Sequence, residues 1–204
     1  MRIEGRRTSD NIEDRRGMSS GGKMAIGGGI GTIVIALVVL LLGGDPTQVL
    51  DDSQGTSTTE SGTVTASPEE EAMKNFVSVV LAGTEDVWTK VFQQSNMTYQ
   101  KPTLVLFRDQ VQSACGYASG ASGPFYCPSD QKVYLDLAFF DELKTKFGAY
   151  GDFAVAYVVA HEIGHHVQDQ LGILNKVNSE RSGTSETRSN NLSIRIELQA
   201  DFLA

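Results

Sequence analysis

The stretch His161-Glu162-Ile163-Gly164-His165 decides the fold and the chemistry that we expect of this chain. Residues four positions apart lie on one face of a helix, so the two imidazoles can bind the same metal ion. Glu162 lies beside them, where it can accept a proton from a water molecule that the metal activates. The sequence therefore predicts a single Zn²⁺ site on a helix, with His161 and His165 as ligands and Glu162 as the general base.

The residues before this motif support a helix. Positions 153–160 contain no charged residue and lead directly into the motif. An apolar approach of this kind is typical of a buried helix. We therefore predict a helix over residues 152–170.

The segment 191–204 supplies the candidate third ligand. Its apolar residues recur both at every second position, as in a strand, and at helical spacing. A catalytic zinc ion takes three protein ligands, and the motif provides two. In a helix, Glu197 and Asp201 would share one face, so that Glu197 could bind zinc while Asp201 accepted the N–H of a bound histidine. This chemistry favours the helix.

Two other acidic residues, Glu180 and Glu186, are rival ligands. Both fall in the polar, Ser-rich stretch 171–190, which we predict to be a loop. Neither has a second acid placed to orient a histidine, so Glu197 with Asp201 remains the preferred pair.

The remainder of the predicted domain, residues 68–204, mixes helices and strands. Ser67-Pro68-Glu69-Glu70 is a helix-start signal, with Gly83-Thr84 as a possible break further along. Two segments have strand character, Thr103–Phe107 and Lys132–Leu137. The fold class that follows is α+β, with a small β-sheet beside the motif helix.

An uncharged segment, residues 24–44, precedes that domain. At about 1.5 Å per residue a helix of this length spans roughly 30 Å, the thickness of a bilayer's hydrocarbon core, so we predict a transmembrane helix over residues 24–44. The basic flank in residues 1–23 predicts a cytoplasmic N-terminus and a domain on the outer side of a cell membrane. A cleaved signal peptide is the alternative, but no good cleavage site follows the apolar run. Residues 45–67, rich in Ser, Thr and Gly, read as a flexible linker.

The two cysteines indicate the redox environment of the domain, and the net charge indicates which classes of partner it can bind. The only two cysteines, Cys115 and Cys127, flank a Gly-rich loop in the part expected outside, so we predict a disulfide between them. Two unpaired buried thiols are the alternative. The formal net charge of −8 argues against nucleic acid as a partner.

Several separate blocks of the chain resemble the neutral zinc metallopeptidases of bacterial membranes. The blocks occur in the order of that family and are Glu4–Arg7, Asp10–Gly17, Gly123–Pro128, Gln131–Asp136, His161–Gln168 and Glu197–Asp201. The resemblance implies a zincin-like domain anchored in the bacterial inner membrane and facing the periplasm. It also implies that His161, His165 and Glu197 bind zinc, that Glu162 is the catalytic base, and that the substrate is a peptide or protein.

Members of that family continue beyond the helix that contains the glutamate ligand. We therefore expect this chain, which stops at Ala204, to be C-terminally incomplete. The alternatives to an active peptidase are a non-catalytic membrane-anchored scaffold and an inactive truncated homologue. A structural zinc site would need a fourth protein ligand, and no further Cys or His is available to provide it.

Overall fold

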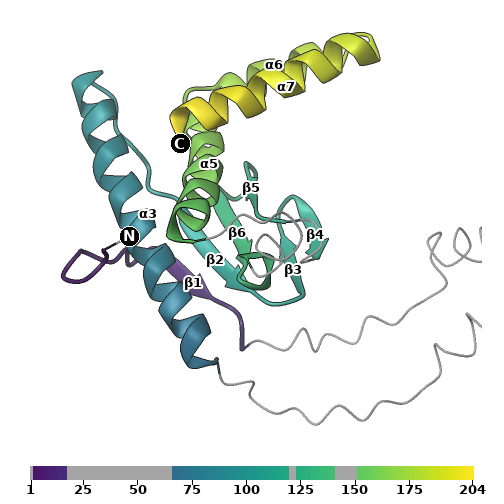
Figure 1. The fold of residues 1–204 in the computed structure, drawn as a ribbon. Coiled ribbons are helices and arrows are strands. Elements are labelled where there is room, and N and C mark those ends of the chain that lie inside the picture. Colours follow the sequence, from purple (N-terminus) through teal and green to yellow (C-terminus); the bar gives the residue numbers. More distant parts are fainter. Residues whose placement is uncertain (1, 18–65, 120–122, 141–150) are drawn as a thin grey trace, which may run out of the picture. The chain divides into compact units, whose positions relative to one another are not determined.

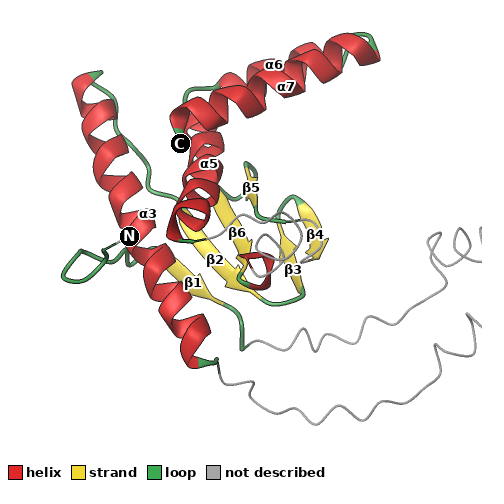
Figure 2. Cartoon of the chain, in the orientation of Figure 1, coloured by secondary structure: helices red, strands yellow, loops and turns green. Residues whose placement is uncertain are grey.

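The computed structural model describes residues 2–17, 66–119, 123–140 and 151–204. Along the chain these residues form β1 (Ile12–Asp14), α3 (Pro68–Gln94), β2 (Thr103–Phe107), β3 (Gln110–Ser113), β4 (Gly116–Ser119), β5 (Phe125–Cys127), β6 (Lys132–Asp136), α5 (Asp152–Gln170), α6 (Ile173–Arg181) and α7 (Glu186–Leu203). Figure 2 shows helices and strands mixed in one unit, which confirms the α+β class.

Helix α3 begins at the predicted signal. The Ser67 side chain accepts from the backbone N–H of Glu70, and the Glu70 carboxylate accepts from the backbone N–H of Ser67. This capping box satisfies two N–H groups that a helix start otherwise leaves unpaired. The helix then continues without interruption through Gly83 and Thr84, so the break considered there does not occur.

The main sheet has the strand order β1-β2-β6-β5. Strands β1, β2 and β6 are parallel, whereas β5 is an antiparallel edge strand. Leu104 and Leu106 of β2 pair with Val133 and Leu135 of β6, and these side chains enter one core with the apolar faces of α3 and α5. Figure 1 shows α5 lying over this sheet. The opposite face forms a smaller cluster that includes Val111 of the β3–β4 hairpin.

Cys115 and Cys127 are joined by a disulfide, as predicted. Cys115 lies in the turn of the β3–β4 hairpin and Cys127 ends β5. The bond therefore ties the edge strand to the hairpin.

The N-terminal segment belongs to the same unit as the rest of the described residues. Strand β1 pairs with β2 in parallel register, with Ile12 opposite Leu104. The Arg7 guanidinium bonds to Glu85 of α3, and Lys132 of β6 forms an ion pair with Glu13. The segment before residue 18 is thus part of the folded domain and contributes strand β1 to its sheet.

This arrangement corrects the predicted localisation. A single span over residues 24–44 would place residues 1–23 and the domain on opposite sides of a membrane, yet β1 and β2 are neighbours in one sheet. The topology with a cytoplasmic N-terminus and an outer domain is therefore wrong. Residues 24–44 and the linker 45–67 lie outside the described residues, apart from Ala66 and Ser67. Within the described part of the chain, every helix is too short or too polar to cross a bilayer.

The stretch after α5 also differs from expectation. Residues 171–190, predicted as a loop, contain α6 and the start of α7, which lie side by side (Figure 1). Helix α6 has no buried residue, so its sequence lacks the apolar periodicity by which helices are recognised.

Candidate metal centre

Helix α5 positions the two motif histidines by burying its opposite face. Val155, Val159 and Ile163 point into the core, and the imidazoles of His161 and His165 project from the other side. Both side chains remain partly accessible, at 19% and 15% of their full exposure. The helix thus offers both imidazoles to one site that solvent can reach.

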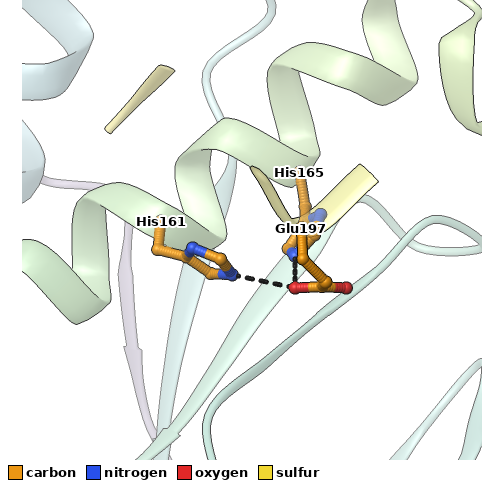
Figure 3. A group of neighbouring side chains, drawn as sticks. All are labelled: His161, His165 and Glu197. Carbon is orange, nitrogen blue, oxygen red and sulfur yellow. Dashed lines mark ion pairs between the residues drawn. The ribbon is translucent and has the colours of Figure 1, made fainter. Parts of the chain in front are cut away.

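Helix α7 brings the third group. Its Glu197 carboxylate lies with Oε2 at 3.3 Å from Nε2 of His161 and 3.4 Å from Nε2 of His165. Figure 3 shows the three side chains converging on one point. Among the described residues, these three form the group whose donor atoms could hold a metal ion, all within 4.8 Å of one another.

The spacing suits a tetrahedral zinc ion. Two donors that each lie roughly 2.0–2.1 Å from such an ion are about 3.3 Å apart. Both imidazole–carboxylate distances meet that value, and the donor set of two imidazoles and one carboxylate is one that catalytic zinc sites use. The donor types and the two imidazole–carboxylate distances therefore fit the metal, and a bound ion would draw the three donor atoms, which lie within 4.8 Å of one another, to that spacing.

Asp201 fixes the proton on His161. Its Oδ1 lies 2.8 Å from Nδ1 of the imidazole, and it also accepts a bond from the Tyr157 hydroxyl. These two bonds, with Tyr157 contributing most, lower the pKa of Asp201. An ionised carboxylate can only accept, so Nδ1 of His161 carries a hydrogen, and in the neutral imidazole Nε2 then has the lone pair, on the side of Glu197.

Gln168 fixes the proton on His165 in the same way. Its amide nitrogen donates to the backbone carbonyl of Ile196 at 2.8 Å, and a carbonyl can only accept, which sets the orientation of the amide. Its Oε1, 2.9 Å from Nδ1 of His165, therefore accepts the imidazole hydrogen. Sequence reasoning placed Asp201 beside a histidine but missed Gln168.

Glu162 is buried behind the histidines, at 8% exposure. Burial raises the pKa of its carboxyl group, while the two neighbouring imidazoles and a hydrogen bond from the backbone of Tyr126 act in the opposite direction. A carboxylate held at such a place is suited to accept and return a proton.

An open pocket of about 360 Å³ adjoins these groups. It is lined by Pro124, Phe125, Tyr126, Pro128, His161, Glu162, His165, Leu174 and Glu197. One side is thus polar, and the other is apolar and comes from β5 and α6. The strand predicted at Lys132–Leu137 could be either a sheet edge, on which an extended substrate could lie, or an interior strand. It is internal, and β5 is the edge strand beside the pocket.

A peptidase also needs a hydrogen-bond donor for the developing oxyanion, and Tyr134 and Tyr157 are two candidates by sequence, but both hydroxyls donate to carboxylates in the structure. The Tyr134 hydroxyl donates to Asp130 and that of Tyr157 donates to Asp201. The third histidine of the chain, His166, is fully buried and bonds to the carbonyl of Gln100, so it faces away from His161 and His165 as its helical position predicts.

Comparison with known proteins agrees with this geometry. The chain is similar to the uncharacterized protein YpfJ of Escherichia coli K12, with 46% identity over 211 residues that cover all of this chain and 73% of the relative. It is also similar to the uncharacterized protein Rv2575 of Mycobacterium tuberculosis, with 47% identity over 107 residues covering 52% of this chain and 35% of that protein. No solved structure matches it. The family model described as "Putative neutral zinc metallopeptidase" matches residues 1–204, and the chain belongs to that family.

Proposed function

We propose that this chain is a zinc-dependent peptidase in which His161, His165 and Glu197 bind one zinc ion and Glu162 is the general base. One observation supports it most. With both Nδ1 atoms protonated toward Asp201 and Gln168, two imidazole lone pairs and a carboxylate oxygen face one another. With neutral imidazoles these are three acceptors facing one another, an arrangement that a metal cation at their centre would satisfy.

The number of ligands favours catalysis over a purely structural site. A structural zinc is closed by four protein ligands, whereas the cluster in the described residues has three and opens on a pocket. The fourth position is then free for substrate and water.

Each side chain has a defined task in peptide hydrolysis. When bound, zinc supplies a Lewis acid that polarises a peptide carbonyl and lowers the pKa of a water molecule. Glu162 accepts the proton of the attacking water and delivers it to the leaving amine. Asp201 and Gln168 hold the two imidazoles in the tautomer that presents Nε2 to the metal.

The edge strand β5 offers a place for the substrate. An extended peptide can add to an exposed sheet edge by main-chain hydrogen bonds. Strand β5 pairs with β6 on one side only, and its residues Phe125 and Tyr126 line the pocket that contains Glu162. A peptide in this position would have its backbone beside the metal ligands.

The direct test is Glu162→Gln in the full chain, with a peptide library as substrate and zinc content measured in parallel. We expect zinc to remain bound and hydrolysis to fall by at least a hundredfold, because the base is lost and the ligands are kept. Glu180→Gln, on the exposed side of α6, is the matched control and should keep the wild-type rate. A Glu162→Gln variant with near wild-type turnover would overturn the proposal.

A further inference from the structure

Helix α7 packs closely along α5 but buries few of its side chains. Helix α6 has no buried residue, and Ala200 is the one buried residue of α7. The outer face of α7 is exposed, with Ile194 and Leu198 more than half accessible. Apart from Ala200 and the partly buried Leu203, which packs against the main core, α7 adds little apolar burial, so specific contacts are needed to fix its register on α5. This register decides whether Glu197 reaches the histidines.

One specific contact is a close approach of the two helix backbones at Gly164 and Ala200. A Cβ placed on Gly164 would lie 2.7 Å from the carbonyl oxygen of Ala200 and 3.1 Å from its Cα. Both are backbone atoms, so relief would require the helices to move apart. Gly164, between the two histidine ligands, and Ala200, three residues after Glu197, thus bring the ligands of both helices together.

The second contact is the Gln168 side chain, which is fully buried. It accepts from His165 and donates to the carbonyl of Ile196 at 2.8 Å and to the side chain of Gln199 at 3.0 Å. Ile196 and Gln199 lie on either side of Glu197 in the sequence. One amide therefore connects a ligand on α5 to the helical turn that holds the ligand on α7.

We propose that Gly164 and Gln168 are positioning residues that set the register of α7, so that the metal site is complete only when α7 is docked on α5. The inference rests on the proposed zinc site. Because metal binds the docked arrangement, zinc must also stabilise the docking of α7.

The chain provides matched controls for both contacts. Gly83 is a helical glycine in α3 with open space around its Cβ position, so Gly83→Ala tests the same substitution without a clash. Gln170 lies on the same helix as Gln168, but its amide bonds to the backbone of Gln100 instead of α7.

The experiment is a zinc titration against a competing chelator, with amide hydrogen exchange of α7 measured with and without zinc. We expect Gly164→Ala and Gln168→Leu each to weaken zinc binding about ten- to a hundredfold, the range known for partners of metal ligands. Gly83→Ala and Gln170→Leu should bind like the wild type. Zinc should slow exchange in α7 of the wild type, and should do so less in the two α5 variants.

Gln168→Glu tests the bond to Ile196 separately from the bond to His165. It is also a second variant to measure in case Gln168→Leu does not fold. It keeps an acceptor for His165 but removes the donor to Ile196, so we expect weaker zinc binding if register matters. Wild-type affinity in Gly164→Ala or in Gln168→Glu would overturn the inference while leaving the proposed peptidase intact. Failure of the wild-type protein to bind zinc would overturn both.

Discussion

The side-chain amide of Asn11 donates to the buried carboxylate of Glu85 at 2.8 Å, joining residues 74 positions apart. The same carboxylate accepts from the Ser9 hydroxyl and from Arg7, and Lys101 lies 3.4 Å away. Glu85 itself is 1% exposed. It is the point at which α3 holds the N-terminal segment that leads into β1.

We predict that Glu85→Ala lowers the free energy of unfolding by about 2 kcal/mol or more. The substitution leaves the hydroxyl of Ser9 and the amide of Asn11 without their acceptor, and unpaired buried donors cost about 1–3 kcal/mol each. Urea denaturation of the full chain measures the effect. The neighbouring Asp86 also bonds to Arg7 but is 68% exposed, so Asp86→Ala should cost less than about 1 kcal/mol. Equal effects of the two variants would contradict this role of Glu85.

A second prediction concerns the acid sensitivity of β1. Hydrogen bonds from Arg15 and from Lys132 lower the pKa of Glu13 from 4.5 to about 2. A pKa that is lower in the folded state contributes stability above the unfolded value, and this contribution is lost as the pH falls from about 4.5 toward 2. We therefore expect Glu13→Gln to destabilise the protein at pH 6 and to have a smaller effect at pH 3. Unfolding free energies of both proteins at the two pH values provide the test, and a difference independent of pH would contradict it.

The elements predicted correctly are those whose signals lie within a few residues. The capping box at Ser67 and the apolar stretch before His161 are local patterns, and the structure has helices at both. Strand β1 could not be found in this way. Ile12-Glu13-Asp14 is short and charged, and its place in the sheet depends on partners such as Lys132, more than a hundred residues away. The single-span topology failed for the same reason, because it treated the N-terminal segment as separate from the domain.

In the candidate site, too, the residues of the local motif were predictable, whereas residues whose roles depend on contacts between helices were harder to find. The motif gives His161, Glu162 and His165 directly, because their spacing on a helix is fixed. Glu197 was reached through the chemistry of zinc, which requires a third ligand, and through the family resemblance of the block that contains it. Gln168 gave no sequence signal, since its role depends on the carbonyl of a residue in α7 that folding brings next to it.

The last prediction compares the zinc affinities of variants at the acidic residues that the sequence offered as the third zinc ligand or as its partner. The structure brings Glu197 to the histidines, and Asp201 contacts His161 only through Nδ1. We expect Glu197→Ala to weaken zinc binding by more than a hundredfold, because two imidazoles alone hold the metal poorly. Asp201→Asn should cost about ten- to a hundredfold, since the amide still allows a hydrogen bond but the charge that orients His161 is gone. Zinc titration against a competing chelator at fixed pH ranks these variants.

Glu180 in α6 and Glu186 in the first turn of α7 are the controls for that ranking. Both are exposed, and neither belongs to the cluster of donor atoms around the two histidines. Their alanine variants should bind zinc like the wild type, because removing an exposed carboxylate away from the site changes only weak, screened electrostatics. If Glu180→Ala or Glu186→Ala lost the metal while Glu197→Ala kept it, the ligand assignment would be wrong. Glu197 would then have no role in metal binding, and the case for Gly164 and Gln168 as the residues that position it would fail with it.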